Sequence, residues 1–225
     1  MFKKFVSKCT AIISASAITL CTLTSFTVSA HNRDYYGGTY KGSTAPYNIK
    51  FVIDPSAQTS LLNSSVYQSA WAWNNISSEV GGIGIAMYTP GMPTYGFFSV
   101  YGDPNLGSTL GRTVPLDSSG NPVSADPAGA NSNWYSVKIY INTSSSAFSG
   151  ASNPTLAAKK TFIHEVGHAL KLSHPVKSSS LSGHNKGKDK NLPLAVMNSG
   201  FPNGDEVSST VTDHDKENLK TKWRA

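Results

Sequence analysis

The chain has 225 residues, 39% of them hydrophobic, and its formal net charge is +6. Lys3, Lys4 and Lys8 supply three of those charges, and no acidic residue lies in the first thirty positions, so the chain from residue 31 onward carries +3. So small a charge gives no indication of nucleic-acid binding. The length from residue 31 is sufficient for one domain with its own hydrophobic core.

Residues 1–30 have the pattern of a secretory signal peptide: a basic start, an apolar middle rich in Ser and Thr, and small residues ending at Ala30. A membrane anchor is the alternative, which the Ser and Thr content disfavours. Cys9 and Cys21 both lie in this segment, so the mature chain contains no cysteine and no disulfide. We expect a secreted, extracellular and monomeric protein without stable membrane association after cleavage.

Period-two alternation of apolar and polar residues predicts strands at 48–54, 82–88 and 134–142. The stretch 89–133 is rich in Gly, Pro, Ser and Asn, but it is too long for one loop in a compact domain. Two short strands are therefore expected inside it, near 95–101 and 111–116.

Three helices are expected, each from its own signal. Apolar residues at helical spacing predict an amphipathic helix over 58–78, packed on the sheet. Asn153 as cap and Pro154 at the first position predict a helix over about 154–171. A final helix begins at Thr212, which forms a capping box with Asp215.

The second helix contains the most informative stretch, TFIHEVGHALKLSH, from Thr161 to His174. His164 and His168 are four residues apart, so their imidazoles project from the same face one turn apart and can share an ion. Glu165 is rotated about 100° around the axis, which places it beside the ion as a base and not as a ligand. The alternative is a helix whose histidines are merely solvated or packed in the core.

His174 is the candidate third ligand, because a turn after the helix can bring it back to the other two histidines. Three protein ligands with one open position are typical of a catalytic zinc site, whereas a structural site has a fourth ligand. Three neutral imidazoles leave the ion its full charge, which lowers the pKa of a bound water.

At these residues the chain resembles the metzincin metalloproteases, most like a bacterial matrixin-type peptidase. The stretch from His164 to His174 is similar to their motif H-E-x-x-H-x-x-G-x-x-H, and PLAVMNS supplies Met197 for their methionine turn. VTDHDKENL, at the final helix, also has a matrixin counterpart. The clear resemblance covers about 154–225.

The resemblance implies an α+β, zincin-like fold, with a mixed twisted sheet, long helices and a zinc cleft. It places an N-terminal extension at 31–47 and a catalytic domain at 48–225, divided into an upper subdomain of about 48–174 and a small lower one of about 175–225. Met197 would form the floor beneath the histidines. Substrate contacts would come from an edge strand and from the loop after Met197: Gly111, Arg112, Thr113, Val114, Ser199 and Phe201.

Three residues depart from the family pattern. Lys171 replaces the motif glycine, Ser199 stands where some metzincins have a tyrosine, and His214 stands where matrixins usually have an aspartate. Glycine adopts a left-handed backbone without penalty, so we expect Lys171 to have positive φ at a cost in strain, with its side chain in solvent. No cysteine-containing propeptide is present, which excludes thiolate latency.

These features predict a secreted zinc-dependent endopeptidase that cleaves proteins or peptides with a zinc-activated water and Glu165 as general base. Two alternatives stay open: a zinc hydrolase acting on cell-wall peptides, and a secreted binding module with a vestigial site. A structural calcium ion is a further candidate cofactor, with ligands from acidic residues in loops. These are Asp103, Asp117, Asp126, Asp205 and Glu206.

Overall fold

The computed structural model describes residues 34–41, 46, 48–90, 98–123, 129, 131–174, 195–197 and 210–224. All of them belong to one compact unit, Arg33–Ala225. The predicted signal peptide, Ser199, Phe201 and the acids at 126, 205 and 206 lie outside the described residues. Within the described part of the chain, no helix is long and apolar enough to cross a membrane.

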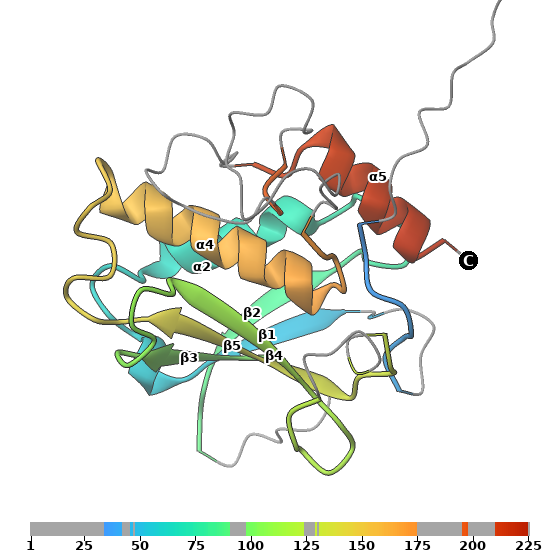
Figure 1. Cartoon of the computed structure of the whole chain (residues 1–225), viewed down its shortest axis with the longest axis horizontal. Helices are drawn as coiled ribbons and strands as arrows, with labels where there is room; N and C mark the ends of the chain where they lie inside the picture. The colour runs from blue at the N-terminus through green and yellow to red at the C-terminus, as the bar shows by residue number, and fades with distance from the viewer. Residues whose placement is uncertain are drawn as a thin grey trace, which may run out of the picture. The chain divides into compact units, whose positions relative to one another are not determined.

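A five-stranded mixed sheet forms the centre of the fold, in the order β2-β1-β3-β5-β4 (Figure 1). Four strands run parallel, and β4 pairs antiparallel with β5 at one edge. The five predicted strands are confirmed, with shifted ends. They are β1 Ile49–Ile53, β2 Ile83–Met87, β3 Phe98–Asp103, β4 Gly111–Leu116 and β5 Ser136–Asn142.

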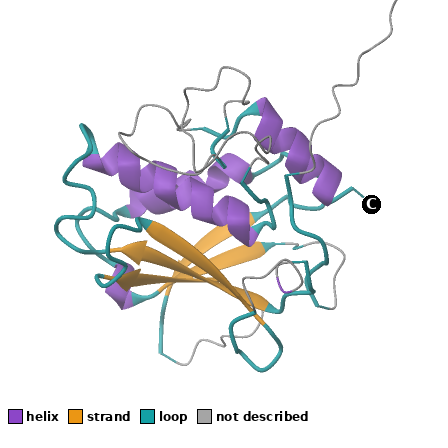
Figure 2. Cartoon of the chain, viewed as in Figure 1, coloured by secondary structure: helices purple, strands orange, loops and turns teal. Residues whose placement is uncertain are grey.

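Helix α4, Pro154–Ala169, packs against β4 and β5 and lies across one face of the sheet (Figure 2). Asn153 caps it by accepting the Leu156 N–H, and Pro154 occupies the first position, as predicted. Phe162 on this helix is fully buried and meets Phe51 of β1 edge to face, with ring centroids 6.1 Å apart. The core therefore lies between α4 and the sheet, and α4 is buried along most of its length.

The predicted helix over 58–78 is wrong in its extent. The structure has a short helix α2, Ser64–Gln68, followed by a 3-10 segment, Ser69–Trp73. Asn63 starts α2 because its side chain accepts the N–H groups of Ser65 and Val66. Asn75, at φ 59°, lies just beyond the 3-10 segment in a backbone conformation that cannot continue a helix. The apolar face still reaches the core, where Val66 and Trp73 are fully buried.

Helix α5, Asp213–Lys222, has the predicted capping box between Thr212 and Asp215. Leu219 and Trp223, four residues apart, form its buried edge. The residues 34–41, here called the N-terminal segment, lie against the domain, and Tyr40 enters its core. The N-terminal segment forms a parallel bridge between Tyr40 and Trp134 and an antiparallel bridge between Tyr35 and Leu172.

Candidate metal centre

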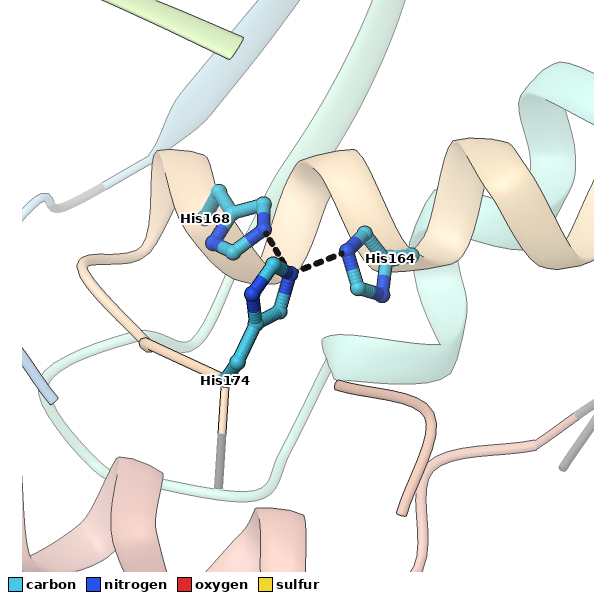
Figure 3. A group of neighbouring side chains, drawn as sticks. All are labelled: His164, His168 and His174. Carbon is cyan, nitrogen blue, oxygen red and sulfur yellow. Dashed lines mark hydrogen bonds between the residues drawn. The ribbon is translucent and has the colours of Figure 1, made fainter. Parts of the chain in front are cut away.

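Three imidazoles meet at the C-terminal end of α4 (Figure 3). His174 Nε2 lies 3.1 Å from Nε2 of His164 and 3.1 Å from Nε2 of His168. The ligand nitrogens of all three lie within 4.8 Å of one another. Two nitrogens bonded at about 2.1 Å to a tetrahedral ion are about 3.4 Å apart, so the spacing suits a single small cation. The three histidines could therefore hold a metal ion.

The outer nitrogens of two of these rings fix their tautomers. His164 Nδ1 lies 2.8 Å from the main-chain oxygen of Val196, and His168 Nδ1 lies 2.8 Å from that of Leu172. A carbonyl oxygen only accepts, so each Nδ1 carries the hydrogen and each Nε2 keeps its lone pair for the centre. Burial lowers the pKa of His168 well below its usual value, which keeps that ring neutral and able to coordinate.

A Schellman turn brings His174 back to the helix. The N–H of Lys171 donates to the His168 carbonyl at 2.8 Å, and the N–H of Leu172 donates to the Gly167 carbonyl at 3.0 Å. Lys171 has φ 68°, as predicted from its place in the motif. The main chain of a lysine therefore makes the left-handed turn that glycine usually makes.

The prediction that the Lys171 side chain points to solvent is wrong. The side chain is 0% exposed, and its Nζ donates to the carbonyls of Gly37 at 2.8 Å and Ser132 at 3.0 Å. Nζ also lies 3.6 Å from the centroid of the Trp134 ring. Burial, with a smaller contribution from the charge of Lys222, lowers the pKa of Lys171 to about 7. These partners could not be predicted from the sequence, because each is a main-chain oxygen or ring distant along the chain.

Glu165 is buried next to the histidines, against strand β4. Its carboxylate accepts the Thr113 hydroxyl at 2.6 Å, and the same hydroxyl lies 2.9 Å from the main-chain oxygen of Glu165. Burial raises the pKa of the Glu165 carboxyl, and the Thr113 hydrogen bond acts in the opposite direction. A buried carboxyl with a raised pKa, held by one hydrogen bond, suits the transfer of a proton.

The strand expected to bind substrate is an edge strand of the sheet. A Cβ on Gly111 would lie 2.8 Å from Glu165 Cγ, so the absence of a side chain there allows β4 to approach the carboxylate. Thr113 contacts Glu165, whereas Arg112 is exposed with its guanidinium 5.2 Å from the Tyr140 ring centroid. Val114 is half-buried in the same strand.

Met197 lies beneath the helix that carries two of the histidines. It is 2% exposed, and its side chain fills the space where Gly167 has no Cβ. Asp215 of α5 holds this turn by accepting the N–H of Val196 at 2.9 Å and that of Met197 at 3.4 Å. The Val196 carbonyl then accepts from His164, so α5 reaches the centre through two hydrogen bonds.

Tyr36 is a residue near the centre that sequence reasoning missed. Its ring centroid lies 6.5 Å from that of His168 and 5.9 Å from that of Trp134. Burial raises the pKa of Tyr36, and the charge of Glu165 adds to the effect. No motif or periodicity marks this position, because the N-terminal segment is irregular.

The described residues contain one group of three or more His, Cys, Asp or Glu side chains close enough to hold an ion, and it is the histidine group. Of the acids considered for calcium, Asp117 instead binds the main-chain N–H groups of Ser119 and Asn121. Asp103 likewise accepts the Asn105 N–H at 2.9 Å.

No protein-family model matches the sequence, and no curated protein matches it significantly. Solved structures do match. The GM1-bound form of the ECX AB5 holotoxin aligns with a TM-score of 0.46 at 16% identity, over 80% of each chain. Myroilysin aligns with a TM-score of 0.41 at 15% identity, over 85% of this chain and 92% of that one. Both are distant likenesses.

Proposed function

We propose that this protein is a secreted zinc-dependent endopeptidase of the metzincin type, most similar to the matrixins. One observation carries the proposal: three Nε2 atoms converge beside a buried glutamate, and two of their rings are fixed by carbonyl oxygens. A nitrogen-only set of three ligands suits zinc with an open coordination position. The sequence motif and its downstream methionine support the same assignment.

Zinc, when bound, would lower the pKa of a water and polarise the substrate carbonyl. Glu165 would accept the proton of the attacking water and pass it to the leaving amine. Thr113 would hold the carboxylate in place, since its hydroxyl is within hydrogen-bond distance. A substrate in extended conformation would pair with the edge of β4 that faces away from β5, over Gly111–Val114, since the Pro115 carbonyl on that edge already accepts the Val123 N–H.

The decisive experiment compares the mature wild type with Glu165→Gln. We expect about one zinc per chain in both proteins by elemental analysis, because the substitution spares the ligands. Casein or gelatin cleavage should depend on the metal, cease with chelator, and fall at least about 100-fold in the variant. Near wild-type proteolysis by the variant would exclude Glu165 as the base.

The same assay separates the alternatives. Isolated cell-wall peptides, offered in parallel, would be cleaved in preference to casein if the protein were a cell-wall hydrolase. A zinc-loaded wild type inactive on both substrate classes would indicate a vestigial site.

A further inference from the structure

The N-terminal segment pairs with the residues that lead directly to His174. The Tyr36 N–H donates to the Lys171 carbonyl at 2.8 Å, and the Ser173 N–H donates to the Asp34 carbonyl at 3.0 Å. Residues 34–36 and 171–173 thus form a short antiparallel pair around the Tyr35–Leu172 bridge. Ser173 precedes His174, so the pairing fixes the main chain from which the third imidazole projects.

The N-terminal segment also rests on the main chain of residues 131–134. A Cβ on Gly38, whose φ is 66°, would lie 2.6 Å from the Asn131 carbonyl oxygen, so no side chain fits between the two backbones. The Trp134 N–H donates to the Thr39 carbonyl at 2.9 Å, and the Lys41 N–H donates to the Trp134 carbonyl at 2.7 Å. The segment is therefore held on one side by the turn after α4 and on the other by residues 131–134.

The Lys171 side chain joins these two sides. Nζ donates to the carbonyl oxygen of Gly37 in the N-terminal segment and to that of Ser132 in the facing residues 131–134. A neutral amine and an ammonium can each make both bonds, so this contact does not depend on the protonation state. Glycine at this position would allow the same turn but would leave both carbonyl oxygens without this donor.

We propose that Lys171 is a positioning residue that makes the N-terminal segment part of the metal centre. Its main chain turns the chain back after α4, and its side chain fastens the segment that holds the approach to His174. This inference rests on the proposed metal site. It assigns to the lysine a task that a glycine at the same place would not perform.

Two substitutions separate the backbone role from the side-chain role. Lys171→Met keeps the bulk and the positive φ but has no donor, and Lys171→Gly relieves the φ strain and also has no donor. We expect both to weaken zinc binding about 10–100-fold in chelator competition, as loss of groups that orient metal ligands commonly does. The visible absorption spectrum of the cobalt-loaded proteins should change as well, because His174 would be less well placed. Lys159→Met, in the same helix but far from the segment, should match the wild type.

Hydrogen exchange supplies a readout that needs no metal. In the metal-free proteins, peptides covering Tyr36 and Ser173 should exchange faster in both Lys171 variants, while peptides from the sheet stay protected. A wild type that binds no zinc would overturn the proposed function, and the exchange comparison would still test the fastening. Unchanged exchange at Tyr36 and Ser173, or zinc binding by Lys171→Gly as tight as the wild type, would overturn the inference.

Discussion

The Thr113 hydroxyl has a single hydrogen to donate, and two oxygens of Glu165 lie within hydrogen-bond distance of it, one in the main chain and one in the carboxylate. When Glu165 is ionised, that hydrogen stabilises the carboxylate, so removing it should raise the carboxyl pKa further. We therefore expect Thr113→Val to shift the acidic limb of the kcat/KM profile to higher pH. Thr113→Ser keeps the hydroxyl and should keep the wild-type limb. A valine variant with an unshifted limb would mean that the contact does not tune the base.

At Lys171, the backbone conformation could be predicted from the sequence, whereas the direction of the side chain could not. Its positive φ follows from local geometry, because the chain must reverse between His168 and His174. The direction of its side chain depends on Gly37 and Ser132, which are brought close only by the tertiary fold. The helix caps at Asn153 and Thr212 belong to the local kind and were predicted correctly.

Helix α4 depends on Gly167 for its contact with the methionine turn. An added Cβ would lie 2.9 Å from Trp73 Cζ2 and 3.2 Å from Met197 Cε, and closer still to Met197 Sδ. Gly167→Ala should therefore destabilise the fold by about 1–3 kcal/mol despite the better helix propensity of alanine. Urea unfolding measures this, with Gly150→Ala as control, since a Cβ there meets no atom within 4 Å. Equal stability of the two variants would show that the Met197 side chain can move to make room for the added methyl group at little cost.

Helix α5 reaches the centre through the Asp215 carboxylate, towards which main-chain N–H groups point. Asp215→Asn replaces one of the two acceptor oxygens with an NH₂ group, which cannot accept a hydrogen bond. Each main-chain N–H left without an acceptor should lower the free energy of unfolding by about 1–3 kcal/mol. Because Val196 also orients His164, we expect zinc affinity to fall about 10-fold or more.

The control for that experiment is Asp213→Asn, in the first turn of the same helix. Its carboxylate is 97% exposed and pairs with Lys216, and exposed ion pairs contribute little to stability, so the free energy of unfolding should stay close to that of the wild type. If the two variants behaved alike in both stability and zinc affinity, Asp215 would have no special link to the centre.

At the level of whole elements, periodicity located the strands better than it located the first helix. Alternation is a short-range pattern, and β1, β2 and β5 formed where it predicted strands. The apolar spacing over 58–78 was also real, since its central residues are buried, but caps and backbone φ set the ends. The hydrophobic pattern reports which face is buried and does not report how long the helix is.

On the scale of the molecule, the strand order could not be read from the sequence. Nothing local places β3 between β1 and β5 or makes β4 antiparallel. The N-terminal segment was equally hidden, because it binds through main-chain groups and has no periodic pattern. The histidine cluster was predictable, since four- and six-residue spacings bring the three rings together through one helix and one turn.

The buried Lys171 predicts a pH dependence of the stability of the whole domain. Its pKa is about 7 in the fold and 10.5 as an ordinary lysine, so between these values the unfolded chain holds more protons than the folded one. The free energy of unfolding should therefore rise with pH across this window. Burial of the lysine should destabilise the fold most below about pH 7, where both states are protonated.

Lys222 also has a lowered pKa because of burial, so the effect of Lys171 is measured as the slope of the wild type minus that of Lys171→Met. Urea unfolding with chelator present, from about pH 7 to about pH 9.5, stays below the usual titration of tyrosine and avoids the pH dependence of metal binding. A difference that is flat or falls with pH would mean that the two carbonyls and the Trp134 ring keep the ammonium charged in the fold.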